Sequence, residues 1–219
     1  MSHVTLIRHG QANSAARDET SYDRLSELGH RQAAWLGAHF DGSGERFARV
    51  YCGTLRRHRE TAQSMGAADH AEVIEDPRLN ELSYFDLAQI FEAQHGVAVP
   101  LNREEFAVHM PRMFTAWSEN RLEGAPESFD AFRARTTEAL MEIAAGEGRA
   151  LVVTSAGLIA MCLKVTMDLG LPAMAHACLA VMNTSVHRFQ PLGEALLMTQ
   201  FNAIPHLETP DRQFAQTHL

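Results

Sequence analysis

Short, mainly apolar runs alternate along this chain with longer stretches in which apolar residues recur every three or four positions. The short runs are typical of buried strands, and the wider spacing is typical of helices with one buried face. Runs of the first kind predict strands at 4–7, 49–52, 73–74 and 150–153. Because strands alternate with helices, the pattern predicts an α/β fold: a three-layer α/β/α sandwich with a largely parallel central sheet.

The helical stretches begin at residues that suit helix starts. Ser26 is a suitable N-cap for a helix that runs to about Phe40, Thr54 is predicted to cap a second helix, and Ser128 starts a third. An apolar helix ending near Leu169 follows the strand at 150–153. The first three place apolar residues on one face: Leu28, Ala33, Leu36 and Phe40; Leu55, Ala62 and Met65; Phe129, Phe132, Leu140 and Ile143.

The pattern changes between about residues 82 and 127, where strand-like runs are missing. Asn102-Arg103-Glu104-Glu105 forms a capping box, which predicts the start of a helix. Pro111 should kink or split that helix. The helix buries residues at helical spacing: Phe106, Met110, Phe114 and Trp117. We interpret the segment as a helical insertion within a single domain that spans residues 1–219.

Two further strands are predicted late in the chain, near 184–189 and 195–201. Pro191 and Gly193 lie between them, and such residues are typical of a tight turn. The pattern predicts a hairpin, and therefore an antiparallel addition to the sheet.

Charge and cysteine content narrow the possible functions. The chain carries 19 Lys and Arg against 27 Asp and Glu, a formal net charge of −8, which argues against a broad surface for nucleic acid or anionic membranes. An anionic substrate would therefore need a local cluster of positive groups. Cys52, Cys162 and Cys178 lack metal-binding spacing and are interpreted as reduced thiols. With no apolar run of membrane-spanning length and no room for a signal peptide, we expect a cytoplasmic protein.

The candidate chemistry begins where the first predicted strand ends, at Arg8-His9-Gly10. A strand end in an α/β sheet holds a side chain rigidly beside the ligand crevice. Neutral imidazole is a good nucleophile, and the guanidinium of Arg8 is a planar fork of donors suited to phosphate or carboxylate. The alternative is a surface Arg–His pair, because the tripeptide arises by chance in roughly one or two per cent of chains this long.

Three other segments could join His9. The stretch 53–62 places arginines in the first turn of a helix, where backbone N–H groups also attract phosphate, although a solvated basic face is the alternative. Glu81 could protonate a leaving oxygen, but considered alone it is a surface acid. Thr154-Ser155-Ala156-Gly157 is a strand–turn–helix junction that can present N–H groups to an anion.

Taken together, these segments resemble the histidine phosphatase superfamily in its phosphoglycerate-mutase-like branch. The motifs follow in the family's order: Leu6-Ile7-Arg8-His9-Gly10-Gln11, Leu25–Gly29, Leu55–Ala62, Leu79-Asn80-Glu81, and Glu127-Ser128 with Arg135. The resemblance implies that His9 is the nucleophile that forms a phosphohistidine and that Arg8 and Arg57 bind the phosphoryl group. It also implies that Glu81 is the proton donor and that the insertion lies over the active site.

One position departs from the family pattern. The family has a second catalytic histidine where this chain has Ser155, which can donate only a neutral hydrogen bond. Loss of one preorganised donor to an anionic transition state lowers the rate on the order of 100- to 1000-fold. The other histidines offer no obvious substitute from sequence, although His58, next to Arg57, could lie nearby. Ser155 therefore stays a phosphate-binding candidate, and the sequence predicts reduced efficiency.

Several rival functions fit the sequence less well. The loop after His9 lacks the longer Trp/Asn-containing segment expected of a glycolytic mutase. A cysteine-dependent phosphatase needs an arginine six positions after its cysteine, where His58 follows Cys52. No nucleotide-binding phosphate loop and no cluster at metal-ligand spacing is found, so neither metal nor cofactor is expected.

The strongest rival is a non-catalytic module that binds phosphoesters or phosphoproteins, and Ser155 motivates it. A nucleophile and a proton donor would be superfluous in such a module, so His9 and Glu81 favour catalysis. The expected partner is a small phosphorylated substrate or inorganic phosphate, with neither nucleic acid nor membrane. A homodimer is left open, because an exposed edge strand or helix could pair two copies.

Overall fold

Six strands form one sheet within the residues that the structure, a computed structural model, describes: 3–13, 15–16 and 18–218. The strands, in the spatial order β3-β2-β4-β1-β5-β6, are β3 (Val73–Glu75), β2 (Arg49–Cys52), β4 (Ala150–Thr154), β1 (Val4–Arg8), β5 (Val186–Leu192) and β6 (Ala195–Ala203). β3, β2, β4 and β1 are parallel, whereas β5 and β6 are an antiparallel hairpin at one edge. The predicted α/β class, the largely parallel sheet and the late hairpin are confirmed.

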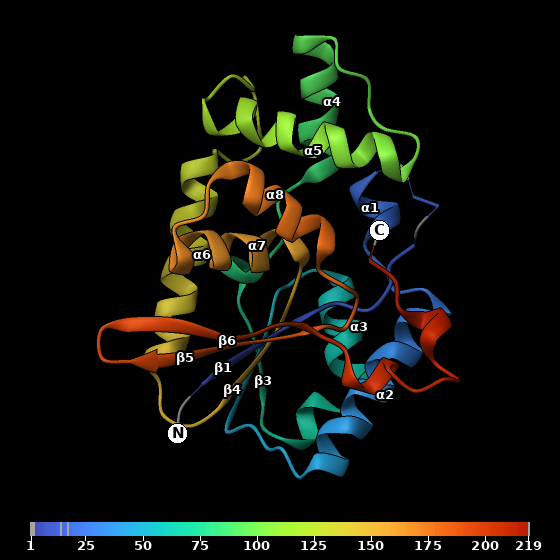
Figure 1. Ribbon diagram of the computed structural model, residues 1–219, viewed down its shortest axis with the longest axis vertical. Helices are drawn as coiled ribbons and strands as arrows, with labels where there is room; N and C mark the ends of the chain where they lie inside the picture. The colour runs from blue at the N-terminus through green and yellow to red at the C-terminus, as the bar shows by residue number, and fades with distance from the viewer. Residues whose placement is uncertain (1–2, 14, 17, 219) are drawn as a thin grey trace.

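Helices cover both faces of this sheet, as Figure 1 shows. One side carries α2 (Glu27–Ser43) and α3 (Arg56–Ser64), and the other carries α6 (Phe129–Ala145), α7 (Ala156–Met167) and α8 (Leu171–Ala180). Alternate residues of the central strands divide between two apolar cores, because successive side chains of a strand point to opposite faces. Leu6 and Val152 join the core with α6 and α7, whereas Ile7 and Val153 join the core with α2 and α3.

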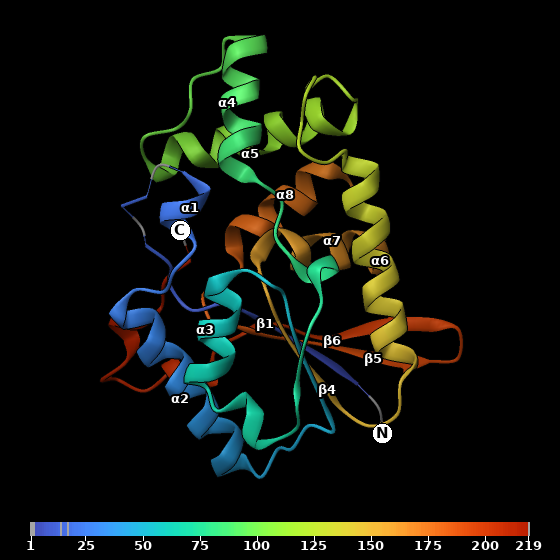
Figure 2. The same ribbon diagram turned by 180° about the vertical axis from the view of Figure 1, so that it is seen from behind.

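The segment between β3 and α6 leaves the sheet and forms two helices at one end of the molecule. These are α4 (Tyr84–His95) and α5 (Arg103–Ser118), seen at the top of Figure 2, with the short α1 (Glu19–Tyr22) beside them. Asn102 caps α5 as predicted, its Oδ1 accepting from the Glu105 N–H at 2.8 Å. The helix is not split at Pro111 and continues to Ser118.

Two further helix starts, at Ser26 and Ser128, are capped by the residues named from the sequence, whereas the cap named for α3 is wrong. Ser26 Oγ accepts from Gly29 N–H at 3.0 Å, as an N-cap should. Thr54 does not cap α3, because its backbone N–H and hydroxyl are both paired with the Asn80 side chain. The carboxylate of Asp23 takes that place and accepts from the backbone N–H groups of Arg56 and Arg57 at 2.9 and 3.1 Å. A residue distant in sequence therefore occupies the helix N-terminus that we expected to be free for phosphate.

Smaller elements complete the chain. Short 3₁₀ turns span Ala67–Asp69, Pro77–Leu79, Pro205–Leu207 and Gln213–Ala215. α8 was not predicted, because its apolar sequence follows that of α7 after a break of only a few residues.

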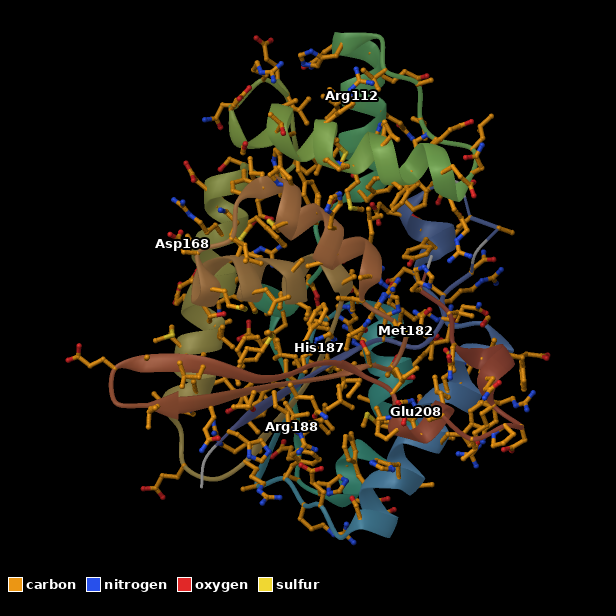
Figure 3. All side chains as sticks on the ribbon, in the orientation of Figure 1. Arg112, Asp168, Met182, His187, Arg188 and Glu208 are labelled. Atoms are coloured by element: carbon orange, nitrogen blue, oxygen red, sulfur yellow. The ribbon has the colours of Figure 1, made fainter. Side chains whose placement is uncertain are left out.

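Over the described part of the chain, every helix is too short or too polar to cross a membrane. Side chains fill the space between the sheet and both helical layers (Figure 3).

Candidate active site

The parallel pairing of β1 with β4 brings the ends of two distant segments together. Arg8 lies opposite Thr154 in the register, and the His9 N–H donates to the Thr154 carbonyl at 2.8 Å. The residues that follow, including Ser155, therefore meet at the carboxyl edge of the sheet, where α/β folds hold their ligands. Arg8, His9, Arg57 and Glu81 all line one cavity of about 430 Å³ at this edge. Ser155 is fully buried and does not line it.

His9 is held in a single orientation and tautomer. Its ring is 2% exposed, and Nδ1 lies 2.7 Å from the Gly10 carbonyl oxygen. A carbonyl can only accept, so Nδ1 carries the proton and Nε2 carries the lone pair. Burial, followed by the charges of Arg57 and Arg8, holds the pKa of His9 well below its usual range. The imidazole is therefore neutral near neutral pH, which is the state required of a nucleophile.

Two buried guanidinium groups flank this imidazole. Arg8 Nη1 donates to the carbonyls of His218, at 2.6 Å, and Val181. Arg57, 1% exposed, donates from Nη1 to Asp23 at 3.0 Å. In both arginines Nε is buried and has no hydrogen-bond partner among the described residues. Two buried, positively charged donors beside one imidazole form a site that suits a phosphoryl group.

Glu81 is fixed by the first turn of α7. Its Oε2 accepts from the Gly157 N–H at 2.9 Å, and its Oε1 accepts from the Leu82 N–H at 3.0 Å. A Cβ at residue 157 would lie 2.4 Å from Oε1, so any other residue there would displace the Glu81 carboxylate from this position. The carboxylate faces the cavity in a defined orientation, as a general acid requires.

Ser155 is paired with a histidine, which is the main departure from the sequence-based expectation. His58 Nε2 lies 2.6 Å from Ser155 Oγ, and both side chains are fully buried. The centroid of the His58 ring is 5.8 Å from that of His9. Burial and the charge of Arg57 hold the pKa of His58 well below its usual range. The sequence offered no obvious substitute for the second histidine but allowed that His58 could lie nearby, and the structure places it beside His9.

A second carboxylate in the cavity escaped sequence reasoning. Glu19 of α1 lines the cavity and accepts from the Phe85 N–H at 2.9 Å. Burial raises the pKa of Glu19 above its usual value. His218 and Asp23 were missed as well, the first bound to Arg8 and the second to Arg57. None of these residues belongs to a motif or a periodic pattern, so only the folded arrangement identifies them.

We also searched the part of the chain that the structure describes for side chains that could bind a metal ion. No group of three or more His, Cys, Asp or Glu side chains there could hold a metal ion. The three cysteines are buried and form no disulfide, and one of them, Cys178, lines the cavity.

Comparison with known proteins agrees with the motifs. Residues 4–203 match the model of the histidine phosphatase superfamily (branch 1). The chain is 28% identical to a metal-independent phosphoserine phosphatase of Arabidopsis thaliana, covering 95% of this chain and 84% of that protein. It is 30% identical to a probable phosphoglycerate mutase GpmB of Serratia proteamaculans, covering 96% of this chain and 97% of that protein.

The fold is shared with solved structures. A mutant of phosphoserine phosphatase from Entamoeba histolytica, solved in complex with phosphoserine, superposes with a TM-score of 0.69 at 20% identity. The superposition covers 94% of this chain and all of that one. At this level of identity the likeness concerns the fold.

Proposed function

The chain belongs to the histidine phosphatase superfamily (branch 1), and on that basis we propose that it hydrolyses phosphate monoesters through a phosphohistidine at His9. One observation carries the proposal: Nε2 of His9 keeps its lone pair while two buried guanidinium groups stand beside the ring. A site that only binds anions would not need an oriented neutral imidazole. The phosphatase interpretation is preferred to a mutase because of the short loop after His9.

The reaction has two balanced steps. His9 Nε2 forms a bond to phosphorus as the bond to the ester oxygen breaks, and protonated Glu81 gives its proton to the departing alkoxide. Arg8 and Arg57 hold the equatorial phosphoryl oxygens during this displacement. Water then attacks the phosphohistidine while the Glu81 carboxylate accepts its proton. Phosphate leaves, and neutral His9 and protonated Glu81 are restored.

The apolar part of the cavity lining supports an apolar leaving group. The segment of about 82–127 contributes most of this wall, and we propose that it acts as a cap that selects the alcohol. The wall consists mainly of apolar side chains: Leu82, Phe85, Val99, Leu101, Phe106 and Met110. The nearby cation, Arg103, is directed at the His218 ring at 3.0 Å. We therefore favour a small phosphate ester with an aromatic or aliphatic alcohol over one with a charged alcohol.

The test is turnover of an aryl phosphate with metal ions chelated. We expect the wild type to release aryl alcohol and to accumulate protein that carries the phosphoryl group of a labelled substrate. This protein-bound label should survive alkali but not acid, as a phosphohistidine does. His9→Ala should lose both. Release at the wild-type rate by His9→Ala would refute the mechanism.

A binding module without turnover remains the alternative, because Ser155 stands where the family has a second histidine. Phosphate binding by the wild type, with no release of alcohol and no labelled protein, would favour it. The homodimer and the cytoplasmic location remain predictions from the sequence.

A further inference from the structure

The peptide group that joins Gly10 to Gln11 is held from both sides. Its carbonyl, on Gly10, accepts from His9 Nδ1, with 2.7 Å between the two atoms. Its N–H, on Gln11, donates to Oε1 of Gln32 at 2.8 Å. Gln32 is a fully buried residue of α2 that does not line the cavity. The mechanism above gives it no role.

The planarity of the peptide bond makes these two contacts depend on each other. In a trans peptide the C=O and the N–H lie in one plane and point in opposite directions. An acceptor fixed on the N–H side therefore fixes the direction of the carbonyl on the other side. Gln32 thus aims the Gly10 carbonyl at His9, and that carbonyl decides which ring nitrogen of His9 carries the proton.

Only one orientation of the Gln32 side-chain amide satisfies all of its contacts. Nε2 donates to the Ala215 carbonyl at 2.7 Å and to the Thr217 hydroxyl at 2.9 Å. A carbonyl can only accept, so the amide nitrogen must face Ala215 and the amide oxygen must face Gln11. The reverse orientation would set N–H against N–H at Gln11 and oxygen against oxygen at Ala215, which is costly in a buried site. The acceptor for the Gln11 N–H is therefore fixed.

The Thr217 hydroxyl extends this support to the neighbouring peptide. It accepts from Gln32, so its own hydrogen goes to Asn183 Oδ1 at 2.9 Å. Nδ2 of Asn183 then donates to the His9 carbonyl at 3.2 Å. One chain of hydrogen bonds therefore holds the peptides on both sides of Gly10.

We propose that Gln32 selects the tautomer of His9: by fixing the Gly10–Gln11 peptide, it keeps the proton on Nδ1 and the lone pair on Nε2. Gln32 is a positioning residue, because it acts through the peptide and does not touch the substrate. The inference rests on the proposed phosphatase function, in which Nε2 attacks phosphorus. It gives a residue of α2 outside the cavity a part in preparing the nucleophile.

The competing interpretation is that Gln32 only anchors the C-terminal segment, residues 213–217, to α2. Its contacts with Ala215 and Thr217 do join the two, and their loss would lower stability whether or not His9 changes. The two interpretations differ in one observable, which is the ring nitrogen of His9 that carries the proton.

The decisive experiment determines that nitrogen by NMR of the ring nitrogens in isotope-labelled protein at neutral pH. The signals of His9 are those that His9→Ala lacks. Gln32→Met keeps an unbranched side chain of similar length but has no amide oxygen to accept from Gln11. We expect the wild type to be protonated on Nδ1, and we expect protonation on Nε2 to become the major form in Gln32→Met.

Single-turnover formation of the phosphoenzyme from 4-nitrophenyl phosphate gives the kinetic counterpart. Gln32→Met should slow this step about 10- to 100-fold, the usual cost of losing a group that orients a functional imidazole, with a smaller change in KM. Gln32→Glu keeps an oxygen that can accept from the Gln11 N–H. It should therefore retain the wild-type tautomer and a rate well above that of Gln32→Met, whatever its change in stability.

Gln94→Met is the matched control. The side-chain amide of Gln94 also clamps a backbone N–H and a backbone carbonyl, both on Glu123, at 2.9 and 2.8 Å. Gln94 lies on α4 and does not line the cavity. Its replacement should leave both the tautomer of His9 and the rate near wild type.

His206 reports on the C-terminal segment in the same spectra. Its Nε2 lies 2.8 Å from the Thr184 hydroxyl, and its carbonyl accepts from Arg212, which immediately precedes the segment. Unchanged His206 signals in Gln32→Met would show that the segment has kept its place while His9 changed. Urea unfolding shows which variants are folded.

Hydrogen exchange of the wild type tests the inference without a variant. The Gln11 N–H should exchange slowly with solvent, because it is bonded to a buried acceptor. Free exchange of this N–H in protein whose His9 is protonated on Nδ1 would overturn the inference, since the tautomer would then be kept without Gln32.

The outcomes separate this inference from the proposed function. If His9→Ala loses the label while Gln32→Met keeps the wild-type tautomer and rate, the inference is wrong and the phosphatase mechanism stands. A slower Gln32→Met with an unchanged tautomer would also overturn it and would favour the anchoring role. If the wild type itself is never labelled, the proposed function fails, and the NMR of His9 still decides whether Gln32 sets the tautomer.

Discussion

At the residue scale, the site depends on keeping an imidazole neutral beside two positive charges. Arg57 and Arg8 both disfavour protonation of His9, and burial acts in the same direction. Arg8, His9, Arg57 and Glu81 could be proposed from sequence because each stands in a short motif with a recognisable order. The contact of His58 with Ser155 could not, because the two residues are 97 positions apart and no local pattern relates them.

Arg57→Gln should change the pH dependence of the reaction as well as its rate. The guanidinium lowers the pKa of His9, so its removal raises that pKa and moves the acid limb of the kcat/KM profile to higher pH. The rate at neutral pH should fall on the order of 100-fold through the lost phosphoryl donor. Arg56→Gln, on the exposed side of the same helix turn, is the control and should leave the limb unmoved. An unshifted limb in Arg57→Gln would contradict the assigned cause.

At the element scale, the apolar patterns predicted the strands and most of the helices. The groups that cap the ends of these elements were harder to predict, because some of them come from residues distant in sequence. The capping of α5 by Asn102 is local and was predicted. The capping of α3 was not, because the Asp23 carboxylate reaches it from another segment while Asn80 engages Thr54. Local propensity therefore identifies an element more reliably than it identifies the group that terminates it.

Asp23→Ala should remove the cap of α3 and destabilise the protein by about 1–2 kcal/mol, measured by urea unfolding. Asp18→Ala is the comparison, because Asp18 caps only the short, exposed α1 through the Ser21 N–H at 2.8 Å. Asp18→Ala should lower the free energy of unfolding by less than Asp23→Ala does. Equal losses in the two variants would show that the contact of Asp23 with α3 adds nothing to stability.

Helices α4 and α5, which we propose to lie over the cavity as a cap, lead to a prediction about substrate preference. Phe106 and Met110 of α5 line the apolar wall, so kcat/KM should be higher for naphthyl phosphate than for phosphoserine. Phe106→Ala should reduce kcat/KM for the naphthyl ester about tenfold, since lost apolar contact in a pocket is worth about 1–3 kcal/mol. Val108→Ala, on the exposed face of α5, should leave it unchanged. A preference for phosphoserine would contradict the apolar assignment.

At the scale of the whole molecule, the central sheet could be predicted because each buried strand reads as an apolar run. Its spatial order, with β4 between β1 and β2, could not be derived from the runs alone. That order decides which strand ends are neighbours. The order of the strands therefore brings the residues of the candidate site together. Sequence motifs can name these residues but cannot predict how they are arranged.

Stability should decrease as the pH falls below about 6.5, the ordinary pKa of histidine. Burial lowers the pKa of His187, on β5 and labelled in Figure 3, and of His206 to about 3. The unfolded chain therefore binds protons that the folded chain excludes, and each such histidine costs about 1.4 kcal/mol per pH unit across that interval. His206→Gln keeps a donor for Thr184 and should reduce the slope of unfolding free energy against pH by about this amount. An unchanged slope between pH 6 and 4 would refute this account.

The parallel pairing of β1 with β4 also has a consequence for biosynthesis. β1 leaves the ribosome well before the strand beside it, because β4 lies far later in the sequence. Domains are completed as the chain emerges, and contacts this distant in sequence form late and slowly. His9, at the end of β1, therefore emerges long before the strand that lies beside it. A nascent chain stalled before β4 would carry His9 without the strand that completes the candidate site.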